Sequence, residues 1–115
     1  MSSRKKKKPL SLAQLESVSR LFAALSEPGR LLLLQALHDG PLTVTELVEA
    51  SGMKQSNVSK HLALLHDLRL VKRERNGISI RYEIADPMVF SLCNLVCGKM
   101  EKDFRQAAAV FHPEI

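Results

Sequence analysis

Two cysteines, Cys93 and Cys97, stand four residues apart near the end of the chain and are its only thiols. On a helix, such residues share one face with Cβ atoms about 5–6 Å apart, which is wider than a disulfide accepts. Two thiolates on one face can instead converge on a soft metal ion or react with a thiol-reactive effector, and a two-fold axis could bring four sulfurs together. Free cysteine also behaves as a small buried hydrophobe, so packing and sensing both stay open.

A second group of residues has the chemistry needed to bind phosphates and base edges. The spacing of Val58, Leu62 and Leu65 predicts a helix over about residues 55–68 with one apolar face. The opposite face is short, polar and basic, and it carries Gln55, Ser56, Ser59 and Lys60. These side chains could approach a DNA groove closely, although a solvated surface helix would show the same pattern.

A basic β-hairpin is predicted directly after this helix. Two strands are expected over residues 71–75 and 78–84, with Asn76-Gly77 forming a type I′ turn at the tip. In the second strand, isoleucine and tyrosine at even positions alternate with polar residues, which is typical of a half-buried strand. The positive charges of the hairpin are Lys72, Arg73, Arg75 and Arg81. They would hold the DNA backbone or reach the minor groove.

A short helix must precede the polar one and position it. Thr43 and Glu46 have the spacing of a capping box, which predicts a helix start. Gly52 lies where this helix must end in a tight turn. Two short helices joined by such a turn and followed by a hairpin make a winged helix, a fold that places one helix in the major groove of DNA.

Three flanking helices complete the prediction, which is mainly α with the order α-α-α-α-β-β-α. Ser11 and Gln14 form a capping box before the first helix; the second is expected over residues 28–38, with Ser26 as its cap and Gly40 at its exit. Asp86 and Pro87 open the last helix. Its apolar surface extends beyond one face, so we expect a homodimer that buries Leu15, Val18, Phe22, Val89, Cys93, Val96 and Met100.

Several segments together resemble the ArsR/SmtB family of bacterial winged-helix repressors. They are residues 22–31 (FAALSEPGRL), 55–62 (QSNVSKHL), 70–73 (LVKR) and 81–87 (RYEIADP). The resemblance extends over roughly residues 17–96, in the order and spacing of the family. It implies a homodimer that represses a nearby promoter and leaves the DNA when a metal or another effector binds.

Two effector sites known in that family do not match this sequence. Many members have a Cys-x-Cys pair before the first helix of the helix-turn-helix, where this chain has Thr43 and Thr45. A hydroxyl is a poor substitute for a thiolate towards soft metals. Other members hold zinc on the last helix, where Asp86 could fill the first ligand position, but the partner positions are Met88, Lys99 and Lys102. We therefore expect neither site.

Composition is consistent with a small DNA-binding protein. The formal net charge of +5 arises entirely from Arg4, Lys5, Lys6, Lys7 and Lys8, which leave 12 basic and 12 acidic residues in the remainder. Residues 1–10 are predicted to form a disordered basic arm, which either contacts phosphates or only solubilises the chain. Residues 11–115 are predicted to form one winged-helix domain. No signal or membrane-spanning segment is evident, so we expect a cytoplasmic protein with no membrane partner.

The sequence therefore predicts a homodimeric, DNA-binding transcriptional repressor. A winged-helix adaptor that binds proteins and not DNA is the alternative, and the basic hairpin counts against it. Enzyme function is not expected, because no catalytic triad, paired-carboxylate motif or glycine-rich phosphate loop is present.

Overall fold

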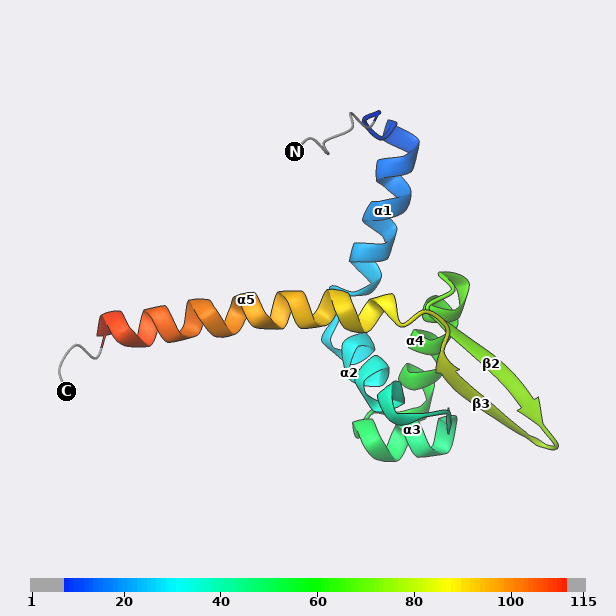
Figure 1. The fold of residues 1–115 in the computed structure, drawn as a ribbon. Coiled ribbons are helices and arrows are strands. Elements are labelled where there is room, and N and C mark those ends of the chain that lie inside the picture. The colour runs from blue at the N-terminus through cyan, green and yellow to red at the C-terminus, as the bar shows by residue number, and fades with distance from the viewer. Residues whose placement is uncertain (1–7, 112–115) are drawn as a thin grey trace. The chain divides into compact units, whose positions relative to one another are not determined.

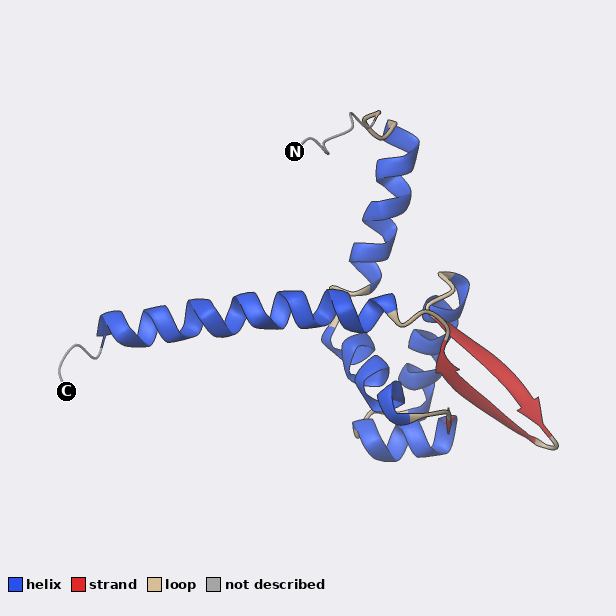
Figure 2. Ribbon diagram, in the orientation of Figure 1, coloured by secondary structure: helices blue, strands red, loops and turns tan. Residues whose placement is uncertain are grey.

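The computed structural model describes residues 8–111, and their side chains up to residue 107. Its elements are α1 (Leu12–Ala24), α2 (Pro28–Ala36), a 3-10 turn (Leu37–Asp39), β1 (Leu42–Thr43), α3 (Val44–Ser51), α4 (Gln55–Asp67), β2 (Val71–Asn76), β3 (Ser79–Ile84) and α5 (Met88–Phe111) (Figures 1 and 2). The predicted order is confirmed, with β1 as an addition. The chain forms two compact units that divide after Ile84. Most of the predicted basic arm, residues 1–7, lies outside the described residues.

Helices α3 and α4 form the predicted helix-turn-helix. The Thr43 hydroxyl accepts the Glu46 N–H at 3.2 Å, and the Glu46 carboxylate accepts the Thr43 N–H at 2.9 Å, which completes the expected capping box. Gly52 ends α3 with φ +74°, in the left-handed region where glycine is favoured. These local signals set the start and the end of α3. Helix α4 begins at Gln55, after a turn of three residues.

The cap of α2 differs from the prediction. Glu27, and not Ser26, is the N-cap residue, and its Oε1 accepts the backbone N–H of Gly29 at 2.7 Å and of Arg30 at 3.3 Å. The Ser26 hydroxyl instead donates to the Ala23 carbonyl at the end of α1. Ser26 therefore belongs to the exit of α1, and Pro28 follows Glu27 at the first helical position, where its missing N–H costs nothing. The α-helix also ends at Ala36, earlier than predicted.

The hairpin joins a three-stranded antiparallel sheet with strand order β1-β3-β2. The pairing of Asn76 with Ser79 places Gly77 and Ile78 at the tip, so the predicted turn centred on Asn76-Gly77 is wrong by one residue. Gly77 has φ +70° while Ile78 does not have a positive φ, which is the pattern of a type II′ turn. Ile78, predicted in a half-buried strand, is 99% exposed.

The core of the first unit lies between α2, α3, α4 and the base of β2. Its buried side chains include the predicted apolar face of α4, Val58, Leu62 and Leu65, each with no exposed surface. Leucines of α2, Leu47 of α3 and Val71 at the start of β2 also belong to it, together with Ala24, Leu37 and Leu70. This packing fixes which face of α4 is turned outward.

The second unit consists of residues 85–115 and contains α5. The Asp86 carboxylate accepts the Met88 N–H at 3.0 Å and so opens the helix as predicted. Among the described residues, no helix combines the length and the apolar character that crossing a bilayer requires.

Candidate DNA-binding surface

The outward face of α4 carries the four side chains predicted to read DNA. Gln55, Ser56, Ser59 and Lys60 are all exposed, whereas the neighbouring Val58 and Leu62 are buried. The polar face is thus rigidly presented, because the opposite face is anchored in the core. This arrangement has the form that a recognition helix needs.

The first turn of α4 adds two residues that the sequence analysis missed. Lys54 is the N-cap residue and Asn57 lies in the first turn, and both are exposed. Within the described chain, no side chain caps this helix and its first turn has no acid. The free N–H groups and the positive end of the helix dipole therefore favour a phosphate oxygen here. In the sequence, these residues could have been found from the lysine at the start of the predicted helix, in place of the usual Ser, Thr, Asp or Asn cap.

The four cations of the hairpin are divided between two faces. Lys72 lies opposite Glu83, and their charged atoms are 3.8 Å apart; Arg81 lies opposite Glu74. Arg81 also lines a hollow together with both glutamates. Each cation of this face is therefore offset by an acid, which reduces its attraction for phosphate.

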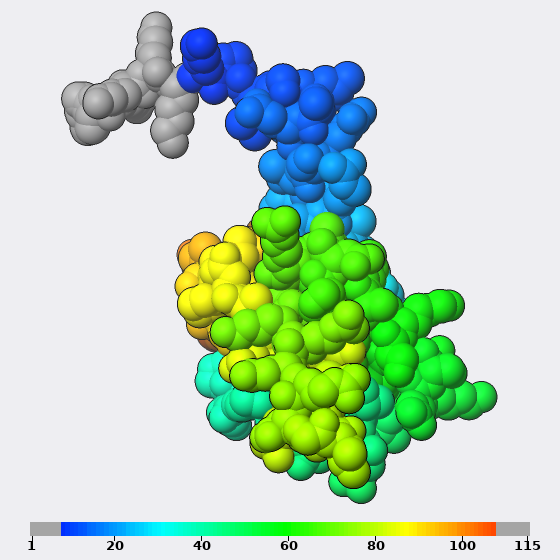
Figure 3. All heavy atoms as spheres, turned by 90° about the vertical axis from the view of Figure 1, so that its right-hand side faces the viewer, coloured from blue at the N-terminus to red at the C-terminus, as the bar shows by residue number. Residues whose placement is uncertain are grey.

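Arg73 and Arg75 lie on the other face of the hairpin. Their cross-strand partners are Tyr82 and Ile80, so neither arginine has an acid directly across the strands, and Arg75 also lines the hollow of Glu74 and Glu83. Both side chains are exposed. Within the hairpin, the positive charges without a directly opposite acid are therefore Arg73 and Arg75, a division that the composition of the hairpin did not reveal. Helix α4 contacts β2, and Figure 3 shows this side of the molecule, with α4 in green and the hairpin in yellow-green.

Two helices expose apolar stripes that the sequence analysis assigned to a dimer interface. On α1, Leu15, Val18 and Phe22 are exposed. On α5, Val96 and Met100 are exposed, and Phe104, one turn further along the same stripe, is 78% exposed. Val89 has no exposed surface in the single chain, so the free part of the stripe begins beyond it.

The two cysteines occupy the first half of α5. Cys93 is half-buried and Cys97 is exposed. Burial, together with the nearby Cys97, raises the pKa of the Cys93 thiol and so disfavours its reactive thiolate. Among residues 8–107, no three His, Cys, Asp or Glu side chains gather closely enough to hold a metal ion.

The positions of the two family effector sites have structural roles in this chain. Thr43 caps α3, and Asp86 caps α5. On α5, Lys99 forms an ion pair with Asp103. Thr43 and Asp86 thus accept backbone N–H groups at helix starts, and Lys99 pairs with a neighbouring carboxylate.

Comparison with known proteins identifies the family of this chain. A family model described as bacterial regulatory protein, arsR family, matches residues 27–73. The HTH-type transcriptional regulator NmtR of Mycobacterium tuberculosis is 44% identical over 84 residues, which are 73% of this chain and 70% of that protein.

Two solved structures share the fold over nearly their whole length. The AntR antimony-specific transcriptional repressor is 35% identical with a TM-score of 0.75, covering 91% of this chain and 96% of that one. The homodimeric winged helix-turn-helix DNA-binding domain Mb0332 of Mycobacterium bovis is 29% identical with a TM-score of 0.74, covering 92% and 95%. The chain therefore belongs to the arsR family of bacterial regulatory proteins and is a DNA-binding, winged-helix transcriptional regulator.

Proposed function

We propose that the protein is a homodimeric repressor that binds operator DNA through α4 and the hairpin, in the cytoplasm, and that it acts by binding and not by catalysis. The observation that carries this proposal is the exposed polar face of α4 beside a hairpin with two unopposed arginines. Gln55, Ser56, Ser59 and Lys60 would meet bases and phosphates in the major groove. Arg73 and Arg75 would contact the backbone or the minor groove beside it.

A two-fold dimer would bring two recognition helices to the same side of the DNA. Mb0332, a structure of similar fold, is homodimeric. The apolar stripe of α1 and the apolar stripe of α5 are each exposed in the single chain, and a second copy would cover them. The two copies of α4 would then lie about 34 Å apart, one turn of DNA.

The recognition helix can be tested by removing its polar groups one at a time. Ser59→Ala and Lys60→Ala are each expected to weaken operator binding by about 1–3 kcal/mol, because each removes a contact in the groove without touching the core. Affinity is measured by fluorescence anisotropy on a DNA fragment selected by the parent protein from a random library. Gln35→Ala, which removes an exposed polar side chain from α2, is the control. Parental affinity in both alanine variants would remove α4 from the recognition role.

The effector is proposed to act at Cys93 and Cys97. AntR, which has a similar structure, is described as antimony-specific, and antimony is a soft, thiol-seeking element. The two thiols share one region of α5, and α5 is also a proposed dimer helix, so a ligand bound there would change dimer contacts and the spacing of the recognition helices. The raised pKa of Cys93 opposes this role and favours packing, which is the alternative that the next experiment distinguishes.

The cysteine proposal predicts that soft ligands release the protein from DNA. Arsenite, antimonite, cadmium, zinc and a persulfide donor are added to the complex of protein and selected DNA, and release is followed by anisotropy. The parent is expected to respond to at least one ligand, and the Cys93→Ser, Cys97→Ser double variant to none. If the parent ignores all of them, or both proteins respond alike, the cysteines only pack and the effector binds elsewhere.

A further inference from the structure

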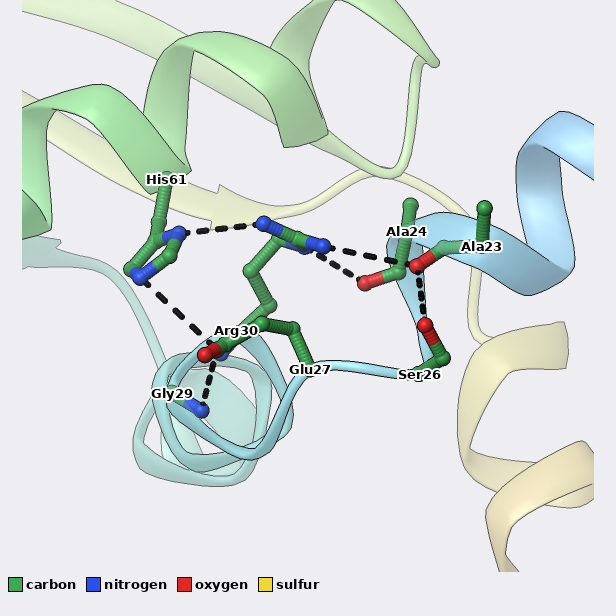
Figure 4. Close-up of polar contacts among 7 residues, drawn as sticks. All are labelled: Ala23, Ala24, Ser26, Glu27, Gly29, Arg30 and His61. Atoms are coloured by element: carbon green, nitrogen blue, oxygen red, sulfur yellow. Dashed lines mark hydrogen bonds and ion pairs between the residues drawn. The ribbon is translucent and has the colours of Figure 1, made fainter.

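One side chain of the recognition helix is turned away from the DNA-facing surface. His61 follows Lys60 in α4, but its side chain is only 16% exposed and lies in a polar cluster with Glu27 and Arg30 (Figure 4). The cluster joins residues 31 positions apart in the sequence. None of its members is among the residues proposed to touch DNA.

Arg30 links two helices through one guanidinium group. Its Nε donates to the Ala24 carbonyl at 2.6 Å and its Nη2 to the Ala23 carbonyl at 3.4 Å, both at the end of α1. Its Nη1 lies 3.2 Å from Nδ1 of His61 on α4. Since a guanidinium is always charged and only donates, Nδ1 must accept, and the proton of a neutral imidazole then sits on Nε2.

Glu27 closes the other side of the cluster. Its Oε1 caps α2 and lies 3.8 Å from Nε2 of His61. Gly29 permits this close approach, because a Cβ there would lie 2.9 Å from Oε1 of Glu27 and 3.1 Å from both Nε2 of His61 and Sδ of Met53. Met53 belongs to the turn between α3 and α4. The start of α2 is therefore packed directly against the helix-turn-helix.

We propose that Arg30 and His61 are positioning residues for DNA recognition, which hold α4 in register with the end of α1. The His61 ring is adjacent in sequence to Lys60, so a rotation of α4 that broke the bond to Arg30 would also turn the Ser59 and Lys60 side chains. Helix α1 carries part of the stripe that a second copy would cover. The cluster thus connects the dimer-facing helix with the base-reading helix. This inference rests on the proposed recognition role of α4.

The test measures discrimination between DNA sequences and not affinity alone. Binding is measured to the DNA selected by the parent protein and to a scrambled fragment of the same composition. Arg30→Gln and His61→Leu are each expected to lower the ratio of the two affinities about tenfold, the size expected for a hydrogen bond to a charged group. His61→Asn, whose side-chain oxygen can take the place of Nδ1, is expected to restore most of the ratio.

A merely structural role predicts a different result. Loss of folded protein lowers both affinities by one factor and leaves their ratio unchanged. Arg20→Gln is the control for lost charge, because Arg20 is exposed on α1, bonds Ser17 of its own helix, and lies opposite the apolar stripe. The Arg30→Gln, His61→Leu double variant should discriminate no worse than Arg30→Gln alone, since Arg30→Gln already removes the bond that His61→Leu breaks.

The outcomes separate the inference from the function on which it rests. If the parent does not discriminate between the two fragments, the proposed recognition by α4 fails. If the parent discriminates and both variants keep its ratio, the positioning role is overturned. If Arg30→Gln does not fold, the comparison of His61→Leu with His61→Asn decides alone. Equal ratios of selected to scrambled DNA affinity in these two variants would also overturn the positioning role.

Discussion

Substituting aspartate for Val96 is expected to dissociate the proposed dimer and to abolish operator binding in the same step. Val96 is about half exposed in the single chain, at 52%, and lies on the α5 stripe with Met100 and Phe104. Burying an unpaired carboxylate costs several kcal/mol, and a two-fold interface would bury two. Sedimentation velocity at micromolar concentration and anisotropy on selected DNA measure the two effects.

A charge placed elsewhere on the same helix is the control for this variant. Asn94→Asp adds the same negative charge with almost no change in shape, at an exposed position off the apolar stripe. It is expected to leave the dimer intact. A parent protein that sediments as a monomer at micromolar concentration would contradict the dimer, and so would a Val96→Asp variant that sediments as the parent dimer does.

The helix boundaries that depend on neighbouring residues could be predicted from sequence. Thr43 and Glu46 cap α3 through bonds three residues apart, and Ser11 and Gln14 do the same for α1. Gly52 ends α3 because the left-handed conformation costs glycine little. At α2, two acceptors compete within two residues, and the choice of Glu27 over Ser26 depends on how α1 ends.

The register of the hairpin shows where a local preference gives the wrong answer. A turn centred on Asn76-Gly77 would place Lys72 opposite Arg81, which are like charges. The observed register moves the pairing by two residues and places Lys72 opposite Glu83. A shift of two leaves every side chain on its original face, so the alternation of the strand cannot distinguish the registers, whereas cross-strand charges can.

Other features could not be predicted because they are tertiary. Strand β1 has two residues, too few to show a period, and it exists only through its pairing with β3. The contact between Arg30 and His61 joins residues 31 apart, and no local pattern signals it. In α4, by contrast, the apolar period identified both the buried face and the exposed face, so the candidate recognition residues were accessible to sequence analysis.

Because Arg73 and Arg75 have no acid directly across the strands, their removal is expected to cause a large loss of DNA affinity. Replacing Arg73 and Arg75 together with glutamine is expected to weaken binding to all DNA sequences and to lower the slope of log affinity against log salt by about two units. If affinities converge near 1 M salt, two lost phosphate contacts correspond to about 60-fold weaker binding at 0.1 M. A salt titration of anisotropy on scrambled DNA measures both quantities.

The matched comparison removes a balanced pair from the other face of the hairpin. Lys72 and Glu83 face each other across the strands, so Lys72→Gln with Glu83→Gln leaves the net charge unchanged. Because an acid already offsets this lysine, the pair variant is expected to keep the parental slope. If it loses as much affinity as the arginine variant, DNA contacts the mixed face of the hairpin. If the arginine variant binds as the parent does at every salt concentration, the hairpin does not hold the DNA backbone, and α4 alone would have to supply the affinity.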